Sequence, residues 1–226
     1  MSEFDRYTND YQAMLNESLS LLGGFNDYYL LQKVNLLKKT TDQTSTQSIL
    51  DFGCGLGGTT LMLKNAFPES RVVGMDISEL SVDKARQHGP NLEFGCISDK
   101  AFMASCEGVF DIIYVANVFH HVPTEKRVVV MDTLRSMLAN NGKVFFFEHN
   151  PYNPITRWVV SRCKFDKNAI LLFPKESRLL FEQAGFKVKK TKYLLFFPYM
   201  FRHFSKLESL FGWLPLGAQY CVTATK

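Results

Sequence analysis

The chain has 226 residues and a net charge of +4, and 46% of its residues are hydrophobic while 21% are charged. This length suits one α/β domain, and this balance excludes an intrinsically disordered chain. The apolar runs are far shorter than the ~18 residues that suggest a membrane-spanning helix, and the polar start "MSEFDRYTND" lacks the layout of a secretion signal. We therefore expect one domain over residues 1–226, cytoplasmic and without an integral membrane span.

Basic residues are concentrated in the last third of the chain. Residues 151–226 contain thirteen Lys and Arg against four Asp and Glu, whereas residues 1–150 are acidic on balance. This charge fits a solvated basic face, or a surface that makes weak peripheral contact with anionic lipid. Nucleic acid is not an expected partner, because no nucleic-acid-binding module accompanies the charge. The five cysteines form no C-x-x-C pair and favour reduced thiols over disulfides or zinc.

Strand and helix patterns alternate through the first two thirds of the chain. Residues 1–47 form an N-terminal helical region, with helical spacing over residues 27–39. Strands are then predicted at 48–52, 71–75, 92–97, 110–116 and 143–149, and helices at 57–66, 78–88 and 124–138. The last helix has Val128, Met131, Leu134 and Leu138 on one stripe, and Asn141-Gly142 turns the chain into the next strand. This alternation predicts a doubly wound, mostly parallel sheet.

The last third departs from this pattern. Helices are predicted at 154–162 and 174–184, and "FKVKKTKYLLFF" and "AQYCVTAT" form strands that would pair antiparallel. Lysines on the first of these strands would protect an exposed sheet edge. The segment between the strands is helical, with an apolar stripe for which packing on the sheet is preferred over contact with lipid or a dimer mate; the stripe consists of Met200, Phe204, Leu207 and Phe211.

A glycine-rich turn joins the first strand to the first helix of the sheet, in "ILDFGCGLGGTT" over residues 49–60. Gly53, Gly55 and Gly58 satisfy G-x-G-x-x-G, a pattern found in dinucleotide-binding loops and in many structural turns. Asp51 precedes the glycines. Its carboxylate would be unfavourable beside a pyrophosphate and is better placed for a cationic ligand.

The stretch "LDFGCGLGG" resembles the first motif of class I S-adenosylmethionine-dependent methyltransferases, and the resemblance extends over about residues 48–149. It implies S-adenosylmethionine as cofactor, a Rossmann-like seven-stranded sheet with one antiparallel C-terminal strand, a helical cap over 1–47 and acceptor-side helices and strands in 150–226. Asp76 would bind the ribose hydroxyls and Ile77 would lie against adenine, whereas Asp99 is either an adenine contact or a turn residue. The expected cofactor-binding residues are Asp51, Gly53, Cys54, Gly55, Gly57, Asp76, Ile77, Ser98, Asp99, Ala116, Asn117 and Lys33.

Transfer of a methyl group to a hydroxyl requires loss of the hydroxyl proton, for which histidine is suited near neutral pH. The candidates at the strand ends are His121 and His149, with Glu148 beside the latter, and a packed structural histidine is the alternative for each. No spacing of ligands predicts a metal site. At Asn153-Pro154 a capped helix that packs on the sheet is favoured, and a helix start whose N–H donors bind an acceptor bearing phosphate or carboxylate is the alternative.

The sequence thus predicts methylation of a small-molecule acceptor, at oxygen, with an anionic or lipid-linked acceptor among the candidates. The alternatives are a nicotinamide-dependent oxidoreductase and a non-catalytic cofactor-binding protein of the same fold. Monomer and homodimer remain open.

Overall fold

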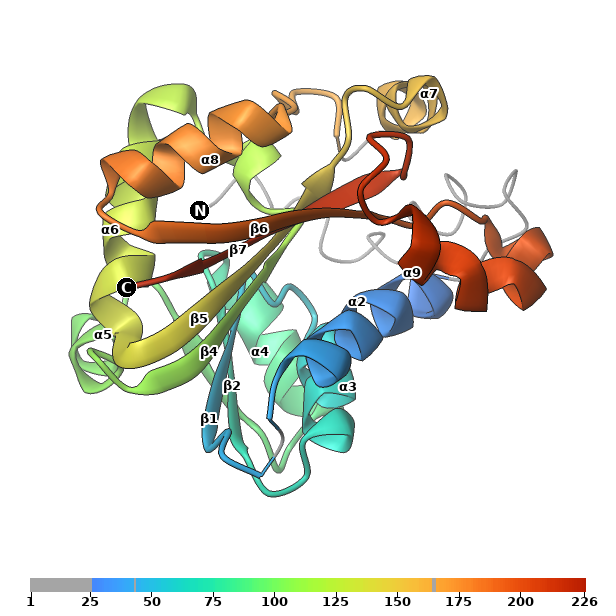
Figure 1. The fold of residues 1–226 in the computed structure, drawn as a ribbon. Helices are drawn as coiled ribbons and strands as arrows, with labels where there is room; N and C mark the ends of the chain where they lie inside the picture. Colours follow the sequence, from blue (N-terminus) through green and yellow to red (C-terminus); the bar gives the residue numbers. More distant parts are fainter. Residues whose placement is uncertain (1–25, 43, 164–165) are drawn as a thin grey trace.

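The computed structural model describes residues 26–42, 44–163 and 166–226, and in it seven strands form one sheet (Figure 1). The strand order is β3-β2-β1-β4-β5-β7-β6. Strands β1 to β5 pair in parallel, and β7 is antiparallel to both β5 and β6. This confirms the predicted sheet with one antiparallel strand. The strands are β1 Ser48–Phe52, β2 Arg71–Asp76, β3 Glu93–Cys96, β4 Phe110–Ala116, β5 Leu138–His149, β6 Lys187–Leu194 and β7 Gln219–Thr225.

Helices cover both faces of the sheet (Figure 1). One face packs against α2 Asn26–Thr40, α3 Gly58–Ala66 and α4 Glu79–His88. The other packs against α5 Lys100–Ser105, α6 Arg127–Met137 and α8 Pro174–Gln183. Helix α2 is the described part of the predicted N-terminal cap, and residues 1–25 of that cap lie outside the described residues. The further elements are η2 Phe119–His121, η3 Thr124–Lys126, α7 Pro154–Arg162, η4 Tyr199–Leu207 and α9 Glu208–Phe211.

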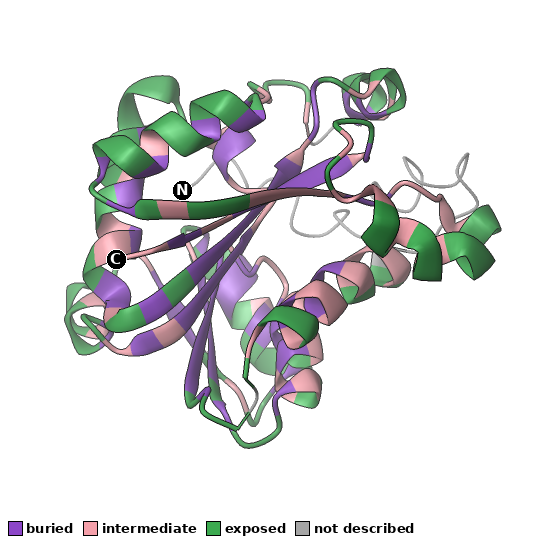
Figure 2. Ribbon diagram, in the orientation of Figure 1, coloured by how far each residue is buried: buried purple, intermediate pink, exposed green. Residues whose placement is uncertain are grey.

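The central strands are buried on both faces, as Figure 2 shows in purple. In β5, Phe146 packs into the cluster formed with α6 and α8, and Phe147 into the cluster formed with α2 and α3. Because successive side chains of a strand point to opposite faces, an unbroken apolar run suits this central position. At the edge of the sheet, β6 exposes Lys187, Lys189 and Lys190, which confirms the predicted charged edge.

The helix predicted over 124–138 is shorter in the structure, and the face that it buries differs from the predicted one at its first turn. A 3-10 turn precedes α6, which ends at Met137, and Leu138 already belongs to β5. Val128 is exposed, whereas Arg127 is buried. The Arg127 guanidinium donates hydrogen bonds to the carbonyl oxygens of Val122 and Ile170 at 3.0 and 2.9 Å. Because backbone acceptors satisfy the buried guanidinium, the charged residue takes the inward position.

The segment between β6 and β7 does not pack as predicted. The exposed fractions of Met200, Phe204 and Leu207 are 57%, 51% and 43%, so the expected packing of this stripe on the sheet is wrong for these three residues. The segment is mainly a 3-10 helix, and Phe201 interrupts it with φ −107° and ψ 22°. Residues that share one face of an α-helix, with 3.6 residues per turn, do not share one face of a 3-10 helix, with three residues per turn. None of the described helices combines the length and apolar character needed to cross a membrane.

Candidate active site

Glycine is required at three positions of the loop between β1 and α3 for different structural reasons. Gly53, Gly55 and Gly57 all have positive φ, at 79°, 54° and 82°. A Cβ on Gly53 would lie 2.3 Å from Val118 Cγ2, and one on Gly57 would lie 2.9 Å from the Phe94 ring. A Cβ on Gly55 would meet nothing within 4 Å. Gly53 and Gly57 therefore allow close packing, whereas Gly55 leaves open space beside bare main chain.

Asp76, at the end of β2, holds the loop from the adjacent strand. Its Oδ2 accepts a hydrogen bond from the Gly55 N–H at 2.9 Å, and its Oδ1 accepts one from the Ser78 N–H at 2.9 Å. A carboxylate offers about four acceptor positions, and hydroxyl groups are donors that suit it. Ile77, the next residue, is exposed beside it. This arrangement fits a ribose with an adjoining flat ring, because the open space at Gly55, the acceptors of Asp76 and the exposed Ile77 side chain lie together.

Asp51 and Lys33 lie behind the loop rather than at its surface. The side chain of Asp51 points to the face covered by α2 and α3, because Leu50 and Phe52 occupy the opposite face. Thr60 of α3 donates a hydrogen bond to Asp51 Oδ2 at 2.7 Å. Burial raises the pKa of Asp51 to about 7 and lowers the pKa of Lys33 to about 8, while the attraction between the two groups opposes both shifts. Asp51 and Lys33, both predicted to contact the cofactor, are therefore buried and attract each other.

The remaining predicted cofactor residues line the ends of the neighbouring strands. Asp99 Oδ1 accepts hydrogen bonds from two backbone N–H groups of α5 and caps that helix, which is the turn role considered for it. The Ser98 hydroxyl donates to Glu79 Oε1 at 3.2 Å. Cys54 is buried, and Ala116 is half-buried. These contacts leave the direct roles of these residues toward the cofactor as predictions.

Asn117, at the end of β4, adopts the left-handed conformation with φ 58°. Its N–H donates to the Phe147 carbonyl oxygen at 2.9 Å, and its Oδ1 accepts a hydrogen bond from Gln219 Nε2 at 3.0 Å. Asparagine tolerates this conformation better than most residues. The turn directs the chain away from the sheet into η2, which carries the two neighbouring histidines.

A buried cluster of imidazoles and carboxylates begins at η2. Glu148 accepts hydrogen bonds from the Phe119 N–H at 2.7 Å and, through its other oxygen, from His120 Nδ1 at 2.6 Å. His120 Nε2 and His121 Nε2 both lie near Asp166 Oδ1, at 3.4 and 3.3 Å. Glu148 thus contacts His120, although His149 is its neighbour in the sequence.

The charges of this cluster depend on one another. Burial alone would lower the pKa of His120, but Glu148 and Asp166 on its two sides outweigh burial and raise this pKa to about 9. Burial would raise the pKa of Asp166, but the His120 and His121 imidazoles that lie against its carboxylate hold this pKa well below its usual range. Burial and the neighbouring charge of His120 lower the pKa of His149 to about 4. At neutral pH the cluster therefore contains two carboxylates, a protonated His120 and a neutral His149.

His149 has a defined tautomer in this arrangement. The Gln219 side-chain amide nitrogen donates to His149 Nδ1 at 3.4 Å, and the same nitrogen donates to Asn117 Oδ1. The assignment follows from this hydrogen-bond pattern: neutral His149 carries its proton on Nε2. His149 is thereby placed to donate a hydrogen bond through Nε2 rather than to accept a proton there.

The sequence did not identify Asp166 or Gln219 as site residues. Asp166 follows the His pair by more than forty residues, and no motif or spacing connects them. The turn that carries Asp166 is fixed because the Ile170 N–H donates to the His120 carbonyl oxygen at 2.8 Å. Only tertiary structure brings these groups together.

The helix start at α7 is already capped. Asn153 Oδ1 accepts hydrogen bonds from the N–H groups of Ile155 and Thr156 at 2.9 and 3.1 Å. The predicted cap at Asn153 is therefore present, and the alternative of donors free for an anionic acceptor is wrong, because the side chain of the capping residue occupies them. Lys164, a nearby basic residue, lies outside the described residues.

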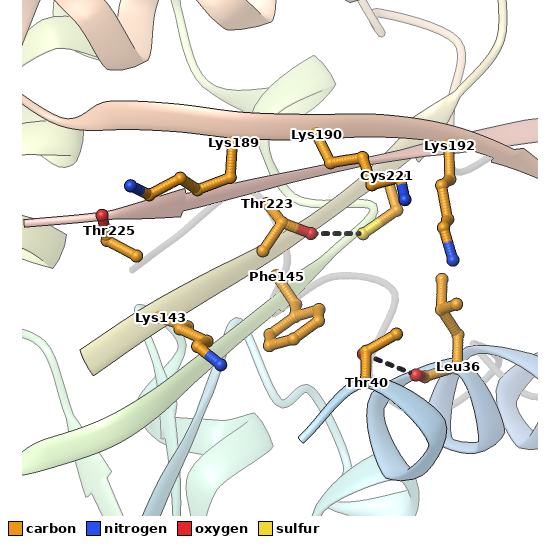
Figure 3. A pocket seen from close by; sticks show the side chains of 10 residues that line it. All are labelled: Leu36, Thr40, Lys143, Phe145, Lys189, Lys190, Lys192, Cys221, Thr223 and Thr225. Carbon is orange, nitrogen blue, oxygen red and sulfur yellow. Dashed lines mark hydrogen bonds between the residues drawn. The ribbon is translucent and has the colours of Figure 1, made fainter. Parts of the chain in front are cut away.

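A cavity of about 340 Å³ lies elsewhere, between the end of α2 and strands β5, β6 and β7 (Figure 3). Its lining includes Lys143, Phe145, Lys189, Lys192 and Thr225. Lys143 pairs with Thr225, six residues before the carboxyl end of β5 at His149. The cavity is thus toward the amino end of β5 and is separate from the glycine loop.

Comparisons with known proteins agree with this geometry. Residues 49–142 match the family model described as a methyltransferase domain. The chain is 29% identical over 132 residues to the ubiquinone biosynthesis O-methyltransferase of Idiomarina loihiensis, covering 55% of this chain and 52% of that protein. It is 36% identical over 81 residues to the trans-aconitate 2-methyltransferase of Variovorax paradoxus, covering 36% of this chain and 31% of that protein. The chain thus spans about half or less of the length of these two curated relatives.

The fold also matches a solved structure over nearly its whole length. A TehB-like SAM-dependent methyltransferase from Corynebacterium glutamicum superposes with a TM-score of 0.67 at 16% identity, over 98% of this chain and 99% of that chain. The matched domain covers the glycine loop and Asp76, and the superposed fold has the same class of sheet. Residues 49–142 thus match a methyltransferase domain, and the chain has the fold of class I S-adenosylmethionine-dependent methyltransferases, whose cofactor is S-adenosylmethionine.

Proposed function

We propose that this protein transfers a methyl group from S-adenosylmethionine to a hydroxyl oxygen of a small molecule. The observation that supports it most directly is the cluster of His120, His121, Glu148 and Asp166 at the carboxyl edge of the sheet, beside the glycine loop. Val118, on which Gly53 packs, lies only two residues before His120. Parallel sheets of this type bind ligands at that edge.

The chain's own residues can be given roles in this reaction. When bound, S-adenosylmethionine supplies an activated methyl group. The Gly55 main chain and the Asp76 carboxylate fix the position of the cofactor, which brings the reacting atoms into line. His149 donates a hydrogen bond through Nε2 to the acceptor, and Gln219 keeps it in that tautomer. Glu148 is a positioning residue, because it contacts His120 and the η2 backbone.

The hydroxyl proton passes to the imidazole of His121, and the neighbouring Asp166 carboxylate stabilises the resulting positive charge. These two side chains are each 12% exposed, whereas those of His120 and Glu148 are 1% exposed. The more accessible end is the one that an acceptor can reach. The names of the two curated relatives support a small-molecule acceptor, and one of them is an O-methyltransferase. A cytoplasmic location and a monomeric or homodimeric state accompany this proposal as expectations.

Binding is tested first, by thermal denaturation of the full chain with S-adenosylmethionine, its demethylated product and NAD(H). A ligand at 100 times its Kd adds about 2.7 kcal/mol to the free energy of unfolding. We expect stabilisation by the first two compounds only. Stabilisation by NAD(H) alone would refute the cofactor assignment for this chain.

Transfer is tested with radiolabelled methyl groups and a panel of phenols, catechols and hydroxy acids. We expect label in one of these classes, and His121→Ala should reduce turnover while His203→Ala, at an exposed histidine outside the cluster, should not. Cofactor binding without labelling of any hydroxyl compound would favour the non-catalytic alternative. Labelling at nitrogen or carbon would contradict the proposed acceptor atom.

A further inference from the structure

Two imidazole nitrogens of η2 and a carboxylate oxygen from more than forty residues later in the chain lie close together. These atoms belong to His120, His121 and Asp166, and they lie within 4.8 Å of one another. Two of the separations are 3.4 Å, from His120 Nε2 to Asp166 Oδ1, and 3.3 Å, from His121 Nε2 to the same oxygen. Zinc–ligand bonds of about 2.05 Å in tetrahedral directions place neighbouring donors about 3.3 Å apart.

These separations suit a shared ion better than direct hydrogen bonds. A charged N–H group and a carboxylate normally approach to about 2.7–2.9 Å. The His120–Glu148 contact, on the other side of the same imidazole, is in fact 2.6 Å. The two contacts to Asp166 are longer by more than half an ångström. Strong hydrogen bonding therefore describes the Glu148 side of His120 but not the Asp166 side.

Glu148 gives His120 the orientation of a metal ligand. Because the carboxylate accepts a hydrogen bond from Nδ1, that nitrogen carries a proton and Nε2 is left to face Asp166. Carboxylate–histidine–metal arrangements of this kind fix the tautomer and increase the basicity of the ligating nitrogen. Glu148 is held in turn by the Phe119 N–H at 2.7 Å.

The charge balance also suits a dication. Glu148 and Asp166 bring two negative charges into a region where the first is fully buried and the second is mostly buried. Buried charges require compensation. A divalent ion between the imidazoles of His120 and His121 neutralises the charge of both carboxylates.

We propose that His120, His121 and Asp166 form a binding site for a divalent transition-metal ion, with Glu148 as the residue that orients His120. Two imidazoles and one carboxylate favour Zn²⁺, and also accept Co²⁺, over the oxygen-preferring Mg²⁺. Three protein ligands leave a fourth position open, as in catalytic zinc sites. The side chains of His121 and Asp166 reach the surface, which provides an entry path for the ion.

The open position has a consequence that rests on the proposed methyl transfer. A hydroxyl that binds a divalent ion loses its proton near neutral pH far more readily than a free one. The ion would then be the means by which the His121–Asp166 end of the cluster removes the acceptor proton. Metal binding itself does not depend on that reaction.

The test measures binding without cofactor or acceptor, so its outcome is independent of the proposed activity. The full chain is treated with a chelator and titrated with ZnCl₂, CoCl₂ and MgCl₂ in a calorimeter. We expect one equivalent of Zn²⁺ and of Co²⁺ to bind, and Mg²⁺ to bind far more weakly. The visible spectrum of the Co²⁺ form should indicate tetrahedral coordination without sulfur-to-cobalt bands, since the five cysteines are not in the cluster.

The Zn²⁺ affinity of single variants tests whether the ion binds at the proposed ligands. Asp166→Asn and His121→Ala should weaken Zn²⁺ affinity by more than about 100-fold, and Glu148→Gln by about 10- to 100-fold. His203→Ala should leave it unchanged. Circular dichroism checks that each variant is folded, and Asp166→Asn, which is nearly isosteric and partly exposed, is decisive if others unfold. Absence of Zn²⁺ binding to the wild type, or unchanged binding in folded Asp166→Asn, would overturn the proposal.

Discussion

Substitution of Gly53 by alanine should destabilise the protein through one identified contact. The residue has φ 79°, and an added Cβ would lie 2.3 Å from Val118 Cγ2. An alanine in the left-handed region costs about 1–2 kcal/mol. Forcing a methyl group into a packed position adds about 1–3 kcal/mol. The free energy of unfolding should therefore fall by about 2–5 kcal/mol for Gly53→Ala.

Gly55→Ala is the matched control within the same loop. Its φ is 54°, but an added Cβ would meet nothing within 4 Å, so only the backbone term of about 1–2 kcal/mol applies. Because the new methyl group would occupy the open space beside the main chain, this variant should lose affinity for S-adenosylmethionine. Gly53→Ala should affect mainly stability, and Gly55→Ala mainly binding.

The assay is urea denaturation followed by circular dichroism, with calorimetric titration of S-adenosylmethionine. Val118→Ala removes the clashing methyl groups, so in that background the cost of Gly53→Ala should fall to the backbone term of about 1–2 kcal/mol. An unchanged cost in the double variant would refute the steric argument. So would equal destabilisation by Gly53→Ala and Gly55→Ala in the wild-type background.

Three further variants test the polar groups. Because the pKa of Asp51 is raised to about 7, the stability of the wild type relative to Asp51→Asn should decrease as pH rises from about 4 to about 7; urea midpoints that keep a constant difference across this window would contradict the shift. Asp76→Asn places an amide N–H₂ group against a backbone donor, and should cost about 1–3 kcal/mol of stability and weaken S-adenosylmethionine binding at least about tenfold by calorimetry. Unaltered affinity would remove Asp76 from the cofactor site. Glu148→Gln should cost about 3–5 kcal/mol in urea denaturation, because it leaves His120 without its buried partner, whereas Glu93→Gln, which breaks a half-exposed ion pair, should cost at most about 1 kcal/mol.

Local pattern was sufficient for most of the fold and for the cofactor loop. The run "KVFFFEH" is apolar at successive positions, so both faces of that strand had to be covered, and the strand lies inside the sheet, between β4 and the antiparallel β7. Gly55 and Asp76 were each predicted to bind the cofactor, and in the fold a hydrogen bond of 2.9 Å joins them. Such features depend on residues whose spacing along the chain already fixes their side of the sheet.

Partner choice among buried polar groups was decided by the tertiary structure alone. Glu148 stands next to His149 in the sequence, yet neighbours in a strand point to opposite faces, and its carboxylate contacts His120 instead. Asp166 joins the cluster through a turn whose position no local pattern specifies. The exposed Met200 side chain has a similar cause. The stripe was predicted for an α-helix, whereas the segment is mainly a 3-10 helix. Sequence periodicity fixes which side of an element a residue occupies, whereas contacts between elements depend on how the whole chain packs.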